Sequence, residues 1–399
     1  MANIRIENGR VILKDRTVNG AMVTINDGKI AAIGGMLQLK KRLLCPPRFA
    51  RGPRNDEIIV IDAKGCFVSP GFIDCHIHGE PEKIFLNEAR HGTTAFVIAE
   101  SCAPLNHLYK RAEGIKEFIG THPFGPNVLG LRLEGPYISK ARAGAQDTAY
   151  IRKPDAKELS DIIGRCSPVL KLMTIAPELR DTKPLIKLMR KHKIIASIGH
   201  SDATYESAIE GIDAGITHAT HIFNAMSGID RCEPGVVGAV LSEDRVAAEV
   251  ILDLIHVHRV LFGLLVKIKK KDNLIIVSDS LTSEKPEIGT GTIFSGANSR
   301  KMEPVPIFTG GAYRFEDGRL AGSSLTMIGA LKNAVKSANL PLPEALNTIT
   351  LNPAKLLGIE GKKGSIAVGK DADIVVFDKE FDVKMTMIRG RIAYIKRSF

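Results

Sequence analysis

Eight apolar runs alternate with helix-like segments through the middle of the chain, and this order constrains the fold more than any other feature. The runs are VSPGFIDCHIH, TTAFVIAE, VLGLRLEG, VLKLMTIAPE, KIIASIGHS, HATHIFNA, AAEVILDLIH and NLIIVSDS. Buried parallel strands that alternate with helices are typical of the α/β class, and eight of them are the number in a (β/α)8 barrel. We therefore predict a TIM-like barrel over residues 67–364.

Polar residues lie where these apolar runs end. They are His76 and His78, Glu100, Glu134, Glu178, His200, His221, Asp253 with His256, and Asp279. Such barrels carry their chemistry at the carboxyl ends of the strands, whereas a purely structural core has no need for ionisable groups there. The pattern therefore predicts an active site at this end of the barrel.

The two ends of the chain consist of short strand-like runs and tight turns. Near the N-terminus, Asn8-Gly9 and Asp27-Gly28 are strong hairpin signals. Residues 364–395 show the same pattern of short strand-like runs and tight turns. We predict one small β-sandwich domain built from residues 1–66 and 365–399. Residues 341–359 are expected to be helical.

The composition is that of an ordinary globular protein, with 44% hydrophobic and 25% charged residues. No window approaches the roughly 18 apolar residues of a membrane span, and the first residues lack the apolar core of a signal peptide, so we expect a cytoplasmic protein. The six cysteines are scattered without CxxC spacing and are expected to be reduced.

The charge of the chain favours an anionic small substrate over a nucleic acid. The formal net charge is +11, but the basic residues are spread out, only 5% of residues are aromatic and there is no tryptophan. Residues 39–54 are the one basic segment without an acidic residue. We interpret it as a solvated loop broken by prolines, with an interaction surface as the alternative.

The histidines and carboxylates at the strand ends suit a divalent metal, which needs deprotonated ligands held on rigid elements. Glu134, His200 and His221, after the third, fifth and sixth runs, supply a three-ligand site. In a strand, residues two apart share a face, so His76 and His78 point the same way and could hold a second metal, with Glu134 as the bridge. We expect one or two divalent ions, zinc first and iron, manganese or cobalt as alternatives.

Asp279 follows the eighth run and completes the set. A carboxylate beside a metal site can take a proton from water and return it to a leaving group. These residues together predict a metal-dependent hydrolase.

The motifs PGFIDCHIHG, LRLEGP, GHSDA, THIFNAM, VSDS and LAGSSLTM resemble the amidohydrolase superfamily and, within it, the N-acetylglucosamine-6-phosphate deacetylase family. The similarity extends through NPAKLLGI and GSIAVGKDADIVV, nearly from end to end. It implies hydrolysis of N-acetylglucosamine 6-phosphate to glucosamine 6-phosphate and acetate in amino-sugar catabolism. It also implies a homodimer whose partner subunit completes the substrate site.

The resemblance also assigns roles to residues. It places the main metal on Glu134, His200 and His221, and the acid/base group on Asp279. The positions that it matches to substrate binding are Gln146, Asn224, Ala225, Arg231, His256, Leu320 and Gly322.

Two departures from the family pattern bear on specificity. Gln146 stands where family members usually have a histidine, and Cys232 stands where a phosphate-binding arginine normally precedes Glu-Pro-Gly, with Arg231 one residue earlier. For this reason an amidohydrolase acting on another N-acyl or cyclic amide remains an alternative. A barrel without catalysis, used as a scaffold, is a further alternative, but it would be expected to have lost some of the ligands.

Overall fold

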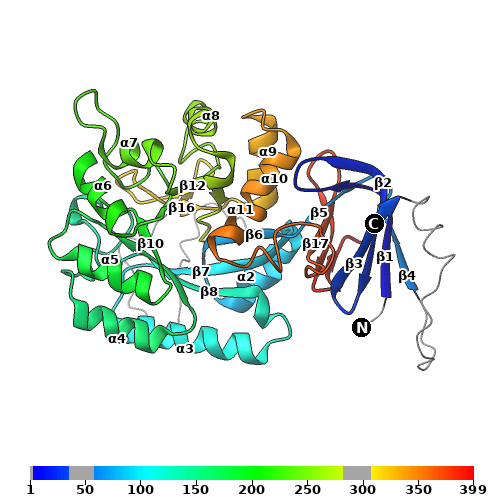
Figure 1. Cartoon of the computed structure of the whole chain (residues 1–399), viewed down its shortest axis with the longest axis horizontal. Helices are drawn as coiled ribbons and strands as arrows, with labels where there is room; N and C mark the ends of the chain where they lie inside the picture. Colours follow the sequence, from blue (N-terminus) through cyan, green and yellow to red (C-terminus); the bar gives the residue numbers. More distant parts are fainter. Residues whose placement is uncertain (1–2, 36–57, 282–306) are drawn as a thin grey trace. The chain divides into compact units, whose positions relative to one another are not determined.

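The computed structural model describes residues 3–35, 58–281 and 307–399 (Figure 1). The basic segment 39–54 lies outside these residues. The chain forms two compact units: Met1–Ile73, Glu88–Thr94 and Leu340–Phe399 make up one, and Asp74–Asn87 with Ala95–Asn339 make up the other. Within the described ranges, no helix is long and apolar enough to cross a bilayer.

An eight-stranded parallel sheet forms the barrel. In chain order its strands are β6 (Phe72–His78), β7 (Thr93–Glu100), β8 (Val128–Leu133), β9 (Leu170–Ile175), β10 (Ile195–Ile198), β11 (His218–Ala219), β12 (Ala247–Ile251) and β13 (Leu274–Val277). Each strand pairs with the next, and a parallel bridge between Ile77 and Ser280 joins the last strand to the first. The predicted barrel is confirmed, because each of the eight apolar runs contains one of its strands.

Helices follow the strands, as in other barrels of this kind (Figure 1). They are α2 (Pro81–Glu88), α3 (Leu105–Thr121), α4 (Ala156–Cys166), α5 (Thr182–Lys191), α6 (Tyr205–Ala214), α7 (Gly235–Ser242), α8 (Arg259–Ile268) and α9 (Met327–Lys336). In α4, the Asp155 side chain accepts from two backbone N–H groups of the first turn and caps the helix. Its buried residues are three or four positions apart, so one face packs inward.

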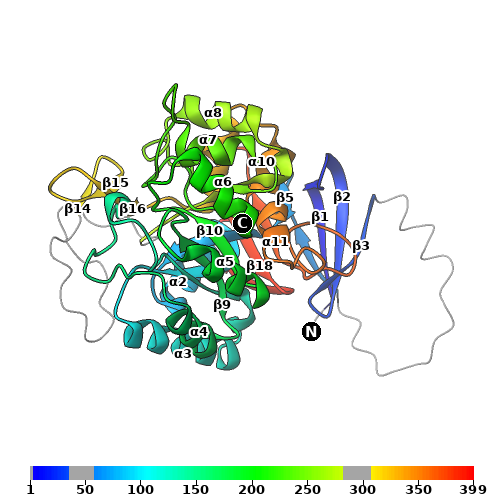
Figure 2. The same ribbon diagram turned by 60° about the vertical axis from the view of Figure 1, so that its left-hand side comes forward.

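A three-stranded antiparallel sheet follows the barrel strands and was not predicted. It consists of β14 (Ile307–Thr309), β15 (Ala312–Arg314) and β16 (Leu320–Ser323) (Figure 2). A parallel bridge between Ser323 and Ser280 attaches it to the end of β13, beside Asp279. Its position brings β16 to the carboxyl end of the barrel.

A second eight-stranded sheet is built from both ends of the chain, as predicted. Its strands are β1 (Asn3–Ile12), β2 (Thr17–Asn26), β3 (Lys29–Gly35), β4 (Ile58–Asp62), β5 (Phe67–Pro70), β17 (Ile374–Phe377), β18 (Val383–Ile388) and β19 (Arg391–Ile395). Residues of β2 and β18, four places apart in the sheet, belong to one apolar core, so the sheet folds around that core. The predicted helical segment 341–359 contains α10 (Leu342–Thr348) and α11 (Leu351–Leu356).

The two hairpin signals near the N-terminus have different outcomes. Asp27-Gly28 forms the turn between β2 and β3, as predicted. The prediction at Asn8-Gly9 is wrong, because both residues lie inside β1, where the pairing with β2 shifts register. Asn8 has φ of 56°, and a Cβ on Gly9 would lie 2.5 Å from Val68 Cγ2, so the pair forms a β-bulge against a neighbouring strand.

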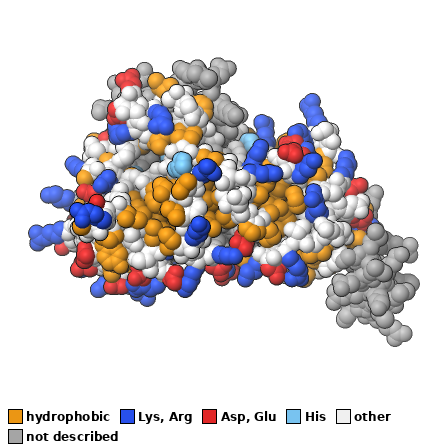
Figure 3. Space-filling view, turned by 90° about the horizontal axis from the view of Figure 1, so that it is seen from above, with side chains coloured by type: hydrophobic (Ala, Val, Ile, Leu, Met, Phe, Trp, Pro, Cys, Tyr) orange, Lys and Arg blue, Asp and Glu red, His pale blue; other side chains and the backbone are white. Residues whose placement is uncertain are grey.

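Charged side chains of both signs are mixed on one face of the molecule. On the face shown in Figure 3, Lys and Arg side chains stand among acidic ones and do not form one continuous patch. The cysteines that the structure describes, Cys66, Cys75, Cys102, Cys166 and Cys232, are free thiols.

Candidate metal centre

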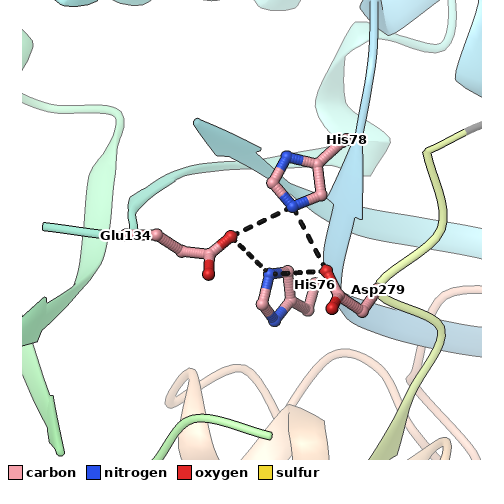
Figure 4. A group of neighbouring side chains, drawn as sticks. All are labelled: His76, His78, Glu134 and Asp279. Atoms are coloured by element: carbon pink, nitrogen blue, oxygen red, sulfur yellow. Dashed lines mark hydrogen bonds and ion pairs between the residues drawn. The ribbon is translucent and has the colours of Figure 1, made fainter. Parts of the chain in front are cut away.

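The structure gathers His76, His78, Glu134 and Asp279 into one buried group (Figure 4). Glu134 Oε1 lies 2.9 Å from His76 Nε2 and 3.0 Å from His78 Nε2. Asp279 Oδ1 lies 3.1 and 3.2 Å from the same two nitrogens. Two imidazoles and two carboxylates therefore converge on one point at the carboxyl end of β6. We call these four residues the first group.

Glu134 also belongs to a second group, with His200 and His221. Its other oxygen, Oε2, lies 3.2 Å from His200 Nε2 and 3.5 Å from His221 Nε2, and those two nitrogens are 3.1 Å apart. One carboxylate thus presents one oxygen to each group. This is the arrangement expected of a carboxylate that bridges two metal ions.

Three of these side chains lie just beyond a strand in an uncommon backbone conformation. His200, His221 and Asp279 each come two residues after the last residue of β10, β11 and β13. Their φ angles are 48°, 29° and 47°, the left-handed region that side chains other than glycine seldom adopt. The turn at each strand end directs the side chain over the barrel mouth, and such conformations concentrate at functional sites.

Hydrogen bonds on the far side of two rings determine which ring nitrogen carries the proton. His200 Nδ1 lies 3.0 Å from Arg142 O, and His76 Nδ1 lies 2.7 Å from Glu249 Oε1. A carbonyl and a carboxylate can only accept, so each Nδ1 donates and a neutral ring keeps a lone pair on Nε2. In a neutral ring those lone pairs would face carboxylate oxygens of Glu134, so the arrangement calls for a cation between them, either a proton or a metal ion.

The electrostatics of the first group favour positive charge. Burial and the Arg132 charge lower the pKa of His76, but Asp279, Glu134 and Glu249 together raise it to about 10. Burial also opposes protonation of His78, yet Asp279 and Glu134 raise its pKa to about 9. Burial would raise the pKa of Glu134, but the surrounding histidines hold it well below the ordinary value. Fully buried carboxylates that stay ionised suit a site for divalent cations.

Four of the residues matched to substrate binding lie beside these groups. Gln146 Nε2 lies 3.4 Å from Glu134 Oε2, and Asn224 Nδ2 donates to His221 O at 3.3 Å. Ala225 and His200 both flank Gly144, where an added Cβ would lie 3.2 Å from Ala225 Cβ and 3.4 Å from His200 Cε1. A Cβ on Gly322 would lie 3.1 Å from Asp279 O.

The other three matched residues lie on further loops and on β16. Leu320 is half-buried at the start of β16. His256 is turned toward Asp253, with 2.6 Å between Nδ1 and Oδ2. Arg231 lies exposed in the loop before α7, next to Cys232.

Two carboxylates that the sequence pattern places at strand ends form hydrogen bonds outside the two ligand groups. Glu100 accepts from Arg111 Nε at 2.5 Å, and Glu178 accepts from Ser201 Oγ at 2.7 Å. A position at the end of a strand is therefore insufficient to place a carboxylate at the metal centre.

Sequence reasoning missed a buried pair behind the ligands. Arg132 on β8 and Glu249 on β12 are both fully buried, and Arg132 Nη1 lies 2.6 Å from Glu249 Oε2. Both stand inside strands whose other residues are apolar, and a charged residue in the middle of such a strand is the signal that could have revealed them.

Comparison with known proteins defines the class of this chain. A model of the amidohydrolase family matches residues 67–393. The chain is 30% identical to a Bacillus subtilis protein named N-acetylglucosamine-6-phosphate deacetylase, over 99% of this chain and 98% of that one. The chain therefore belongs to the amidohydrolase family and, within it, to the family of N-acetylglucosamine-6-phosphate deacetylases.

Further relatives and solved structures agree with this assignment. A Haemophilus influenzae protein of the same name is 34% identical over 84% of this chain and 88% of that one. The crystal structure of N-acetylglucosamine-6-phosphate deacetylase from Pasteurella multocida superposes with a TM-score of 0.85 at 28% identity, covering 98% of this chain and 99% of that one. An Escherichia coli O157:H7 protein named N-acetylgalactosamine-6-phosphate deacetylase is 29% identical over 81% of this chain and 87% of that one. The resemblance predicted from the motifs is confirmed.

Proposed function

We propose that the chain is a metal-dependent deacetylase that hydrolyses N-acetylglucosamine 6-phosphate to glucosamine 6-phosphate and acetate in amino-sugar catabolism. The observation that carries the proposal is the Glu134 carboxylate, which presents one oxygen to each of two buried ligand groups. Asp279 lies in the first of these groups, close to the same histidine nitrogens as Glu134. The relatives of the same family supply the substrate class.

In this proposal two divalent ions bind the two groups, the main one at Glu134, His200 and His221. A divalent metal, when bound, lowers the pKa of water and polarises a carbonyl group, which is the Lewis-acid chemistry that amide hydrolysis needs. Imidazole nitrogens with carboxylate oxygens suit zinc and also accept iron, manganese or cobalt. We propose zinc, and metal analysis of the purified protein tests both its identity and its stoichiometry.

Asp279 is the proposed acid/base group. Burial raises its pKa, but His76 and His78 hold it below the ordinary value, so the carboxylate is ionised near neutral pH. As water bonds to the acetamide carbonyl carbon, Asp279 takes one of its protons. When the bond between carbon and nitrogen breaks, Asp279 returns that proton to the leaving nitrogen, and acetate and a free amine result.

Seven residues are proposed to bind the sugar. They are Gln146, Asn224, Ala225, Arg231, His256, Leu320 and Gly322. Arg231 is the proposed partner of the phosphate group, because its guanidinium can form charge-assisted bonds that Cys232 cannot. The second candidate substrate is N-acetylgalactosamine 6-phosphate, which the name of one relative supports.

The proposal extends to assembly and location. We propose a homodimer, which size-exclusion chromatography with light scattering tests. We place the enzyme in the cytoplasm, because the proposed substrate is a charged sugar phosphate that does not cross a lipid bilayer and so stays inside the cell. We assign catalysis to the barrel domain at 67–364, with 1–66 and 365–399 as the accompanying β-domain.

The decisive experiment is acetate release by the purified, metal-analysed protein. The four substrates are N-acetylglucosamine 6-phosphate, its galactosamine counterpart, unphosphorylated N-acetylglucosamine and an N-acetylmannosamine analogue. We expect a strong preference for the first. A preference for an unphosphorylated sugar, or metal binding without acetate release from any of them, would contradict the proposal and favour another amide substrate.

A further inference from the structure

A buried ion pair spans the barrel interior behind the metal ligands. Arg132 comes from β8 and Glu249 from β12, which are four places apart in the eight-stranded sheet and therefore face each other across the barrel. Neither side chain is exposed to solvent. A barrel that needed only a core would hold apolar residues here.

Glu249 contacts a ligand of each group with a single oxygen. Its Oε1 accepts from His76 Nδ1 at 2.7 Å and from the backbone N–H of His221 at 3.2 Å. The first contact fixes the tautomer and orientation of the His76 ring. The second holds the backbone of His221, whose φ is 29°.

Arg132 contacts the residue that precedes each of these two ligands. Its Nη1 donates to Cys75 O at 3.2 Å, and its Nη2 donates to Thr220 Oγ1 at 3.1 Å. The guanidinium thus ties the middle of β6 to the turn after β11. Arg132 and Glu249 together contact both chain segments that carry ligands, β6 and the turn after β11.

The surrounding hydroxyl groups extend this network without reaching a ligand of either group. Thr220 Oγ1 lies 2.6 Å from Ser197 Oγ and 3.0 Å from Thr174 Oγ1. Ser197 Oγ also lies 2.9 Å from His218 Nδ1. Ser197 therefore offers a matched control in the same buried network.

We propose that Arg132 and Glu249 are a positioning unit that couples the two ligand groups. A buried ion pair adds little net stability compared with apolar residues of similar size, so stability alone does not account for it. Its contacts instead hold one ligand of each group in place. Loss of the unit should therefore weaken metal binding in both groups together. This inference rests on the proposed function, in that both groups bind metal.

Two variants separate positioning from folding. In Glu249→Gln, the amide can still accept from His76, but its NH2 group then faces Arg132 Nη1, another donor. In the double variant Arg132→Met with Glu249→Leu, apolar side chains replace the pair. Proteins often tolerate such a replacement of a buried ion pair without loss of stability. Ser197→Ala is the control, and circular dichroism with thermal unfolding verifies the fold of each protein.

The readout is titration of the metal-stripped proteins with Co²⁺, followed by the visible absorption of the bound ion and by the number of ions bound per chain. We expect two ions in the wild type and in Ser197→Ala, and an affinity about 10- to 100-fold weaker for both ions in the two variants. A folded double variant that binds both ions with wild-type affinity would overturn the proposal. A loss of affinity for only one of the two ions would overturn it as well. A wild-type protein that binds no Co²⁺ would overturn the proposed function itself and this inference with it.

Discussion

The two histidine pairs of the candidate metal centre differ in how the backbone builds them, although Asp279 of the first group shares the left-handed turn of the second pair. His76 and His78 lie inside β6, where regular strand geometry puts residues two apart on the same face. His200 and His221 come from different strands, and each lies in a left-handed turn two residues past the strand end. The comparison teaches that one chemistry can rest on a repeating local geometry or on separate turns that the fold must hold in place.

The left-handed turns need support from elsewhere. A non-glycine residue in this conformation costs on the order of 1–2 kcal/mol. Next to His221, the backbone N–H of Thr220 donates to Ile198 O at 2.9 Å and that of Ile222 donates to Glu249 O at 2.7 Å. His200 O accepts from Ser139 N at 2.8 Å. The pair His200 and His221 therefore depends on neighbouring segments more than the pair His76 and His78 does.

The largest expected effect comes from the residue that both groups share. Glu134→Ala should remove metal from both groups and reduce acetate release to background, because each group loses a carboxylate oxygen. Elemental analysis of the purified variant measures this. Glu178→Gln, a change at another strand-end glutamate, is the control and should keep its metal. Unchanged metal content in Glu134→Ala would mean that the ligand set is misassigned.

Asp279→Asn should separate chemistry from metal binding. The amide keeps its shape and an oxygen, but it cannot take a proton from water, so turnover should fall by about 10²- to 10⁴-fold. Metal in the second group should remain. Steady-state kinetics with metal analysis of the same preparation measures both, and normal turnover would remove Asp279 from the mechanism.

Single histidine changes should separate the two groups. His78→Asn should cost the ion of the first group only, and His200→Asn the ion of the second group only, so each variant should bind one ion per chain instead of two. The metal-to-protein ratio after dialysis tests this. Loss of both ions in either variant would show that the groups do not bind metal independently.

The smallest expected effect comes from the backbone beside His200. A Cβ on Gly199 would lie 2.8 Å from Thr220 Cβ, so Gly199→Ala should force β10 and the turn after β11 apart. We expect a loss of about 1–3 kcal/mol in the free energy of unfolding, with weaker metal binding in the second group and an unchanged first group.

Gly114→Ala provides the matched control for this change. Gly114 lies inside α3, where nothing surrounds an added Cβ within 4 Å, so the variant should be more stable by about 0.5–1 kcal/mol. Urea denaturation measures both proteins. If Gly199→Ala were as stable as the wild type, the second group would not depend on the close approach at Gly199.

Much of the barrel and of the candidate metal-binding groups could be predicted, because the ends of the apolar runs and the ionisable residues coincide in the sequence. Each buried strand leaves an apolar run, and the ligands stand where those runs stop, as with Glu134 after β8. Glu100 has the same position in the sequence pattern, yet it pairs with Arg111. The pattern contains no information on which way a side chain turns after its strand ends.

The bulge at Asn8-Gly9 shows the same limit on a local scale. Asn-Gly favours positive φ, which suits both a hairpin turn and a bulge. In β1 the bulge prevails because the strand continues past it to pair with β5. The partner strand, more than 50 residues away in the sequence, decides between the two.

The sequence by itself determined the order of the eight barrel strands, the sheet made from both chain ends and the pair His76 and His78, because these follow from periodicities along the chain. The sequence predicted that Glu134 is shared, but only the tertiary structure decided which of its oxygens faces each group and that Arg132 and Glu249 meet behind them. The physical reason is the distance along the chain between the residues that interact. Strand and helix periods arise between neighbours in the chain, whereas a metal centre is formed by side chains that barrel closure brings together.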